Sequence, residues 1–475
     1  MKIVTLYNHK GGVSKTTTTF NIATYLADHG KKVLMVDADP QCNLTEIALA
    51  RTIAALDKRA EESGTGDVGV LPGTSILDAL NQRIKGDVAY IDIDKIEPCE
   101  IHKNLDLLRG SVDLSSIEDD LAEAHVQRMS MRTNLMRTYV AIGDFLVRLA
   151  DKKGYDYIFI DVGPSSGALT RAFFLACDAF FIPVAPDRFN VQAIGTLSKI
   201  LSRWIREHQE VISKYNELEM PIRSGRPAFL GAIVQAFKKY AGEAKPGFKL
   251  WMGRLPIEIN SSLRPVLENY SEELYLPSIT NRNSENSIAV EIPDFNQLAP
   301  LMQEVGKAVF NIDRLDTALI TKSDKPWGGN NWSGAQRRMA SYKLLFKWLA
   351  DDLIAFDNGK KISPFPKPVL PKRAPRKNAA KKAEPKVSAD AKSAKSLVKK
   401  STAKPVGKSG AVEGSVQKPE SKPSLRKPAS KPAAKPSAKK PAVKPVAKSP
   451  AKSPVKPVAK SSGETGAPRV KRGKK

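Results

Sequence analysis

One glycine-rich stretch near the amino terminus limits what this chain can fold into: residues 8–19, with the sequence NHKGGVSKTTTT. Residues 2–7 before it are β-branched and aromatic and predict a strand, whereas residues 20–27 predict a helix that ends at Gly30. Because Gly11 and Gly12 lack a Cβ, the backbone between them can turn sharply and direct its N–H groups, with the helix N-terminus, at phosphate oxygens. We therefore predict a phosphate-binding loop.

The side chains that follow the glycines fit the same ligand. Lys15 is expected to reach β- and γ-phosphates, the hydroxyl of Thr16 to bind Mg²⁺, and Thr17 to donate to the α-phosphate. The spacing differs from the usual pattern G-x-x-x-x-G-K-[ST], because Ser14 stands in place of the second glycine and an extra lysine, Lys10, opens the motif.

Four segments, in this order, resemble the ParA/MinD family of ATPases with a deviant phosphate-binding loop. They are the loop itself (KGGVSKT), residues 33–45 (VLMVDADPQCNLT), residues 155–161 (YDYIFID), and residues 180–186 (FFIPVAP). The resemblance covers roughly residues 1–315 and implies an α/β fold with a doubly wound, mostly parallel sheet flanked by helices. It implies a P-loop ATPase domain over 1–315.

The resemblance also assigns roles at the site, with ATP and Mg²⁺ as cofactors and an ATP-dependent sandwich dimer. Lys10 would touch the nucleotide of the partner subunit, Asp39 would orient the attacking water, and Asp161 would hold Mg²⁺ through water. The implied catalytic set is Lys10, Lys15 and Asp39; the metal set is Thr16, Asp39 and Asp161; the nucleotide-binding set is Lys10, Gly11, Gly12, Val13, Ser14, Lys15, Thr16, Thr17, Pro186 and Gln235, the last as an adenine-contacting amide.

Two positions near this site need separate treatment. Asp37 either contributes to the site or only caps its strand. Val162-Gly163-Pro164 departs from the Cys-Pro-Pro or Thr-Pro-Pro of the family, so turnover can differ while nucleotide binding is expected to survive.

Several segments between these motifs predict further elements. Residues 51–72 are polar and contain Gly64 and Gly66, so we expect a surface insertion or flexible loop over about 49–72. Residues 132–152 predict an amphipathic helix, and residues 193–215 predict a helix that carries several basic residues. In the second helix, Arg203 and Arg206 either bind DNA or belong to a solvated face. Residues 238–254 predict a nucleic-acid-binding edge or, as we prefer, a loop with a packed tryptophan.

The positive charge is confined to one end of the chain. The net charge is +26, and residues 359–475 contain 34 Lys or Arg against 5 Asp or Glu. The remaining residues therefore carry a net charge of about −3, as expected of an ordinary globular domain. The segment from Lys360 has no aromatic residue after Phe365 and is rich in Lys, Pro and Ala, so we predict a disordered tail over 359–475. It would bind phosphate backbones by counterion release or would only aid solubility.

A linker and a helix are expected between the ATPase domain and the tail, over 316–358. Residues 321–334 contain Pro326, Gly328 and Gly329 and predict the linker, whereas residues 334–357 show apolar spacing typical of an amphipathic helix. We expect this helix to dock on the ATPase body or on a partner, rather than on a membrane, because Asp351 and Asp352 interrupt its basic face.

Composition narrows the function further. We expect no targeting segment and no membrane-spanning run. The three cysteines lack metal-ligand spacing, which suits a reducing compartment and argues against an iron–sulfur cluster. The resemblance favours a cytoplasmic, nucleoid-associated bacterial ATPase for plasmid or chromosome partition, which binds non-specific DNA as a homodimer and is stimulated by a ParB-like or adaptor protein. The alternatives are a nucleotide-gated scaffold that positions a protein assembly, and a regulator whose tail compacts DNA.

Overall fold

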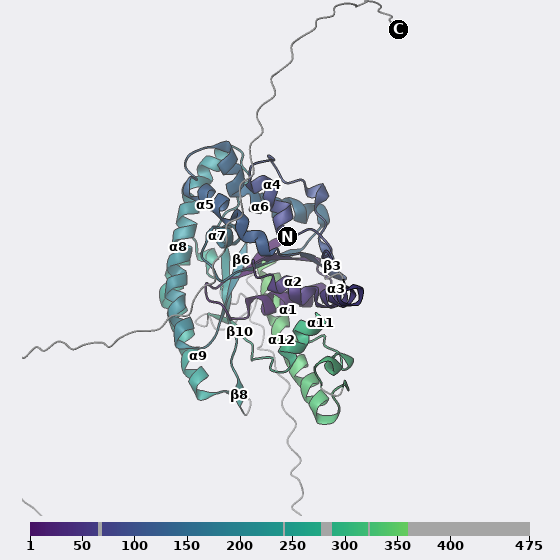
Figure 1. The fold of residues 1–475 in the computed structure, drawn as a ribbon. Coiled ribbons are helices and arrows are strands. Elements are labelled where there is room, and N and C mark those ends of the chain that lie inside the picture. The colour runs from purple at the N-terminus through teal and green to yellow at the C-terminus, as the bar shows by residue number, and fades with distance from the viewer. Residues whose placement is uncertain (65–68, 241–242, 277–286, 322–323, 360–475) are drawn as a thin grey trace, which may run out of the picture. The chain divides into compact units, whose positions relative to one another are not determined.

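An eight-stranded sheet forms the centre of the protein in the computed structural model, which describes residues 1–64, 69–240, 243–276, 287–321 and 324–359 (Figure 1). Its strand order is β10-β7-β6-β1-β5-β2-β4-β3, and only the edge strand β3 runs antiparallel to its neighbour. The strands are β1 Lys2–Leu6, β2 Val33–Ala38, β3 Cys99–His102, β4 Leu105–Leu108, β5 Tyr157–Val162, β6 Ala179–Val184, β7 Ala228–Val234 and β10 Ile288–Glu291. A small hairpin pairs β8 Lys239–Tyr240 with β9 Glu243–Ala244.

Helices cover both faces of this sheet. On one face lie α4 Ile76–Ile84, α5 Glu118–Val126, α6 Thr133–Lys153, α7 Ala168–Ala176, α8 Arg188–Glu217, α9 Pro246–Glu258 and α10 Arg264–Glu268. On the other face lie α1 Lys15–Asp28, α2 Asn43–Ala48, α11 Leu298–Val305 and α12 Gly329–Asp357, with α3 Ala50–Ser63 beside α2 and α11. Because successive strand residues point to opposite faces, neighbours such as Ile158 and Phe159 enter different cores. The predicted doubly wound, mostly parallel α/β fold is confirmed.

The carboxyl ends of three central strands meet at one place. Strand β5 lies between β1 and β2, and Asp161 of β5 pairs in register with Leu6 on one side and Asp37 on the other. In open parallel sheets, ligands bind outside the carboxyl ends of the strands. The fold therefore brings the loop after β1 and the acidic ends of β2 and β5 to one edge.

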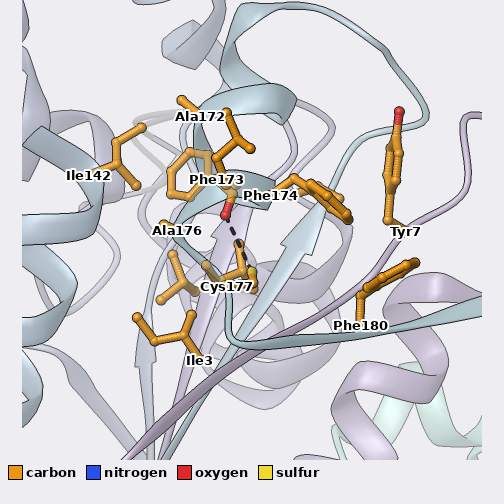
Figure 2. Packing of buried hydrophobic residues seen from close by; sticks show 14 of the residues in the cluster. Ile3, Tyr7, Ile142, Ala172, Phe173, Phe174, Ala176, Cys177 and Phe180 are labelled. Atoms are coloured by element: carbon orange, nitrogen blue, oxygen red, sulfur yellow. Dashed lines mark hydrogen bonds between the residues drawn. The ribbon is translucent and has the colours of Figure 1, made fainter. Parts of the chain in front are cut away.

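An aromatic cluster packs around Tyr7, the residue that follows β1. The ring of Tyr7 lies 5.4 Å from that of Phe174 and 5.5 Å from that of Trp204, and Phe174 in turn lies 5.1 Å from Phe180. Figure 2 shows Tyr7, Phe174 and Phe180 of this cluster together with Cys177, whose thiol donates to the carbonyl of Phe173 (3.3 Å). The position of the loop that follows Tyr7 is thus fixed by a close-packed interior.

Two segments differ from the sequence-based expectation. Residues 50–63, expected as part of a surface insertion or flexible loop, form the helix α3, because Ala, Leu, Arg and Lys dominate up to Ala60; the flexible loop is therefore wrong over these residues. Residues 246–258, expected as a loop, form α9, and Pro246 stands in its first turn, where proline is favoured. Trp251 of α9 is half-buried against the core, as expected of a packed tryptophan.

The helix expected over 334–357 is part of the ATPase body. It is longer than expected, since α12 already begins at Gly329 inside the predicted linker, and it packs beside α1 (Figure 1). Its apolar stripe, including Met339, Phe346 and Leu349, is buried in the same core as α1. The hydroxyl of Tyr342 donates to the carbonyl of Asp294 (2.9 Å). The apolar face is therefore occupied by the body of the protein.

The basic tail from Lys360 lies outside the described residues, so its predicted disorder stays a prediction. Among the helices that the structure describes, none is both long enough and apolar enough to cross a bilayer.

A buried histidine on α8 makes folding stability depend on pH. His208 accepts at Nδ1 from the hydroxyl of Tyr139 (2.8 Å) and donates from Nε2 to the carbonyl of Arg223 (2.8 Å), so its neutral form is fully paired. Burial lowers the pKa of His208 to about 4. Because the folded form resists protonation, its contribution to the free energy of unfolding is complete above pH ~6.5 and is lost as the pH falls towards 4. At pH ~5 the loss is about 2 kcal/mol.

We expect the variant His208→Gln to lose part of this acid sensitivity, because glutamine offers one donor and one acceptor but does not titrate. Urea unfolding at pH 7 and pH 5 measures the effect. His29→Gln, which changes an exposed histidine, is the matched control. An equal loss of stability on acidification in wild type and His208→Gln would contradict the assignment.

Candidate nucleotide site

The loop between β1 and α1 has the backbone of a phosphate cradle. Gly12 and Ser14 both adopt left-handed conformations, with φ of 72° and 59°. Helix α1 then begins at Lys15, and the side chain of its N-cap residue Ser14 makes no capping hydrogen bond. The first N–H groups of α1 are therefore left to a ligand, at the end of the helix that carries partial positive charge.

Ser14 thus occupies the conformation that the second glycine of the usual motif would take. A residue with a Cβ pays about 1 kcal/mol or more to adopt it. The sequence identified the departure, and the structure shows its physical consequence as backbone strain within the loop.

Lys15 lies inside the loop. Its side chain is 7% exposed, and Nζ donates to the carbonyl oxygens of Asn8 and Lys10, both at 3.4 Å. Burial lowers the pKa of Lys15, whereas the nearby carboxyls of Asp161 and Asp39 act in the opposite direction. The side chain of Asn8 is bonded to the carbonyl of Pro183 (2.9 Å), which joins the loop to β6. The long bonds of Nζ leave Lys15 available for a stronger anionic acceptor.

Asp161 is the most unusual group of the site. It is fully buried, and neither carboxyl oxygen has a hydrogen-bond partner of good geometry among the described residues, although the hydroxyl of Thr16 lies near it. Burial, reinforced by the charge of Asp37, raises the pKa of Asp161 to about 8; the Thr16 hydroxyl and then the Lys15 ammonium oppose this increase. A buried carboxyl without a partner is costly unless a cation or donor joins it.

This arrangement fits a magnesium ion held together with a nucleotide. Within the described part of the chain, no group of three or more His, Cys, Asp or Glu residues is placed to bind a metal alone. Mg²⁺ is usually held by one or two carboxylates together with phosphate oxygens and water. Asp161 supplies such a carboxylate, and Thr16 lines the cavity above it.

Asp39 and Asp37 have different positions although both end the strand β2. Asp39 is 6% exposed, lines the cavity, and accepts from the backbone N–H of Gln41 (3.1 Å). Asp37 is fully buried and accepts from the N–H (2.8 Å) and the hydroxyl (2.6 Å) of Thr45. Burial raises the pKa of Asp37 to about 6. Of the two roles left open by the sequence, the geometry favours a structural one, in which Asp37 fastens the start of α2.

An open cavity of about 720 Å³ lies at the phosphate loop; Lys15, Thr16 and Asp39 line it, whereas the fully buried Asp37 and Asp161 are not among its described lining residues. Its inner wall is the loop from Gly11 to Thr17, with Asp39 and Pro164. Its outer wall contains residues that sequence analysis missed: Ala50, Ile53, Ala54 and Asp57 of α3, and Gln303 and Glu304 of α11. The four α3 residues are spaced i, i+3, i+4 and i+7, so their helical period was the signal that they share one face.

A smaller cavity of about 200 Å³ adjoins the loop on the side of Ser14 and Thr17. Gln235 lines it, is 4% exposed, and bonds to the hydroxyl of Thr18 (2.7 Å from Nε2). Pro293 and Asp294, which follow β10, also line this cavity and were not identified from the sequence. Pro186, which follows β6, is buried. It is not among the described residues that line either of these two cavities.

Lys10 points elsewhere. Its Nζ lies 5.1 Å from the centre of the Phe189 ring at the start of α8, and Phe189 is 68% exposed. Lys10 is not among the described residues that line the cavity of its own subunit. The structure therefore separates the two lysines of the loop, with Lys15 inside and Lys10 at the surface.

The two arginines predicted as DNA contacts lie away from the cavity, on α8. Arg203 and Arg206 are exposed, and neither takes part in an ion pair within the described residues. Lys199 is also exposed and lies on the same helical face, at spacing i, i+4 and i+7.

A strand, a glycine-rich loop with a buried lysine, a helix N-terminus and a buried acidic residue on the neighbouring strand together define a P-loop nucleotide-binding protein. Residues 1–214 match a family model described as an AAA domain. Soj, the sporulation initiation inhibitor protein of Bacillus subtilis, is 29% identical over 239 residues, which are 50% of this chain and 79% of Soj. The chromosome partitioning protein ParA of Caulobacter vibrioides is 28% identical over 204 residues, 43% of this chain and 63% of that protein. These matches and the geometry of the site support a relationship to the ParA/MinD family of P-loop ATPases.

Coverage of the relatives is uneven. The matched region spans 52% of an uncharacterised Mycobacterium tuberculosis protein that is 30% identical over 203 residues. Among solved structures, protein DIP2308 from Corynebacterium diphtheriae is 25% identical and covers 64% of this chain and 97% of its own, with a TM-score of 0.48. Cobyrinic acid a,c-diamide synthase from Mycobacterium smegmatis, solved with a bound ATP analog and magnesium, is 20% identical. The match covers 77% of this chain and 100% of that chain, with a TM-score of 0.38. The family assignment depends on the sequence matches and the site.

The strained Ser14 gives a direct test of the loop geometry. We expect Ser14→Gly to raise the free energy of unfolding by about 1 kcal/mol, because glycine adopts the left-handed conformation without the Cβ penalty. Urea unfolding without nucleotide measures this change.

Ser14→Ala is the matched control, since it removes the hydroxyl but keeps the Cβ. It should give no such gain, because the hydroxyl makes no capping bond. A stabilisation by alanine equal to that by glycine would show that strain is not the cause.

Proposed function

We propose that this chain is a ParA-type ATPase that binds ATP with Mg²⁺ and hydrolyses ATP slowly by itself. The observation that carries the proposal is an open helix N-terminus and the buried cation of Lys15 at one cavity, with the buried carboxyl of Asp161 close to Thr16 and Lys15. The helix N-terminus and Lys15 suit phosphate anions, and the carboxyl suits a divalent cation, so the site fits a nucleotide together with Mg²⁺.

Each group has a proposed role that its position supports. The N–H groups of Gly11 to Ser14 and the Lys15 ammonium hold the β- and γ-phosphates, and Thr17 donates to the α-phosphate. Thr16 and Asp161 hold Mg²⁺, which supplies charge neutralisation for the leaving and transferred phosphates. Asp39, which reaches the same cavity, orients the attacking water and assists at the metal.

The base is proposed to occupy the smaller cavity. Gln235 offers an amide there, and Pro293 and Asp294 form the opposite side. Pro186 is not at this cavity, so its proposed contribution is to place the loop after β6 rather than to touch the nucleotide.

Dimerisation is proposed to depend on Lys10. A lysine at the surface of its own subunit, resting on an exposed aromatic ring, is free to reach a nucleotide bound by a second subunit. Removing it should cost the monomer little, since an exposed cation–π contact contributes about 0.5–1 kcal/mol.

Non-specific DNA is the proposed partner of the basic surfaces. Lys199, Arg203 and Arg206 form an exposed stripe on α8. The β8–β9 hairpin and the start of α9 add exposed Lys238, Lys239 and Lys245 together with Tyr240, which is 77% exposed. Cations without base-reading geometry bind phosphate backbones and give salt-dependent, sequence-independent affinity. The tail from Lys360 would add to this affinity.

The cellular role follows from the relatives' names. The Caulobacter relative is called a chromosome partitioning protein and a Treponema pallidum relative a chromosome-partitioning ATPase. We therefore propose plasmid or chromosome partition by a cytoplasmic, nucleoid-associated dimer whose hydrolysis a ParB-like or adaptor protein stimulates.

DNA binding by residues 1–359, which contain every residue the structure describes, tests this proposal. We expect random-sequence duplex DNA to bind only with ATP and Mg²⁺, because two subunits must join to align their basic surfaces. Lys10→Ala should weaken this binding at least tenfold, by fluorescence anisotropy. Lys103→Ala, an exposed lysine in the turn between β3 and β4, is the control.

The full chain should bind more tightly and with a steeper dependence on salt, since its tail releases additional counterions. If residues 1–359 never bind DNA while the full chain binds with or without nucleotide, the tail is the DNA-binding element. The ATPase would then act as a scaffold or switch for another assembly.

A further inference from the structure

The loop between β5 and α7, residues 163–167, reaches the nucleotide cavity through Pro164. It begins two residues after Asp161, and Pro164 lies beside Gly11 of the phosphate loop. A Cβ on Gly163 would lie only 3.1 Å from Oδ1 of Asp39, so the loop also limits where that carboxyl can lie. Its position therefore sets the spacing between the acidic groups and the phosphate loop.

A carboxylate from a distant part of the chain holds the far end of this loop. Glu118, the first residue of α5, accepts at Oε1 from the N–H of Ala168 (2.6 Å) and at Oε2 from the N–H of Leu169 (3.1 Å). These are the first two residues of α7, whose own N-cap residue is Gly167 and supplies no side-chain cap. Negative charge is favoured at this end of a helix, so Glu118 acts as the cap that α7 lacks.

Gly167 makes this contact possible. A Cβ at Gly167 would lie 2.2 Å from Oε1 of Glu118, so a side chain at 167 would displace the carboxylate from this position. Glycine at 167 therefore leaves room for the carboxylate at the start of α7.

The middle of the loop is fastened to the phosphate-loop side. The hydroxyl of Tyr7, at the end of β1, donates to the carbonyl of Ser165 (3.1 Å), and the Ser165 hydroxyl bonds to that of Thr170 (2.7 Å). Tyr7 is itself stacked on Trp204. Loop 163–167 is thus held between the aromatic core at one end and the Glu118 carboxylate at the other.

We propose that Glu118 is a positioning residue for ATP hydrolysis. Its carboxylate anchors α7 and so keeps loop 163–167 at the distance from Asp39 and Gly11 that the reaction needs, without touching the nucleotide. The inference rests on the proposed ATPase function. It predicts that Glu118 affects turnover more than nucleotide affinity, because affinity comes mainly from the phosphate loop.

Glu118→Gln in the full chain tests the proposal, since glutamine keeps the size but loses the charge and can accept with one oxygen only. We expect kcat for ATP to fall by about tenfold or more, as small displacements of reacting groups do. The Kd of a non-hydrolysable ATP analogue with Mg²⁺ should change by less than about threefold, and the amides of Ala168 and Leu169 should exchange hydrogen faster.

Asp119→Asn is the matched control, because it makes the same charge change at an exposed residue of the same helical turn. An unchanged kcat in Glu118→Gln, with faster exchange at Ala168 and Leu169, would reduce Glu118 to a helix cap and overturn the proposal. Equal losses of affinity and turnover, accompanied by a lower unfolding midpoint, would show a role in stability only. If the wild type does not hydrolyse ATP, the proposed function itself fails, which is a separate outcome.

Discussion

A buried carboxyl without a partner, at the centre of a parallel sheet, is the constraint on which the rest of this structure depends. Asp161 lies between β1 and β2 and faces Asp37 across the sheet, with Lys15 as the nearby cation. Burying such charges opposes folding unless strong compensation is available. The structure accommodates them in a close-packed interior and leaves Asp161 for a cation. The folded protein is therefore less stable without its ligand than with it, so ligand binding raises the free energy of unfolding.

The surrounding elements serve mainly to keep this site open and in place. Asn8 ties the phosphate loop to β6, Asp37 ties the start of α2 to β2, and Tyr7 supports the loop after β5. None of these side chains needs to touch a nucleotide. They fix the relative positions of three loops that come from separate parts of the chain, and that arrangement is what a phosphate-transfer site requires.

Much of this could be predicted from local patterns, because the loop chemistry and strand composition act over a few residues. The phosphate loop, the strands ending in Asp37 and Asp161, and the amphipathic helix α6 follow from glycine position, β-branched runs and helical spacing. What was missed depends on contacts between distant segments. Nothing local shows that Glu118 meets α7, or that Pro293 lies near Ser14. The helix α3 could not be predicted with the loop signals present, because Gly64 and Gly66 and the polar residues around them favour a loop in the same segment.

The measurement that most directly tests the central claim compares Asp161→Asn with wild type by urea unfolding, with and without an ATP analogue and Mg²⁺. Without ligand, at pH 7, the variant should be more stable, because it removes the buried ionisable group whose pKa burial raises well above its usual value. In the presence of the ATP analogue, Mg²⁺ should raise the free energy of unfolding of the wild type. It should not raise that of the variant. A less stable variant, or one that keeps the full Mg²⁺-dependent stabilisation, would contradict the account.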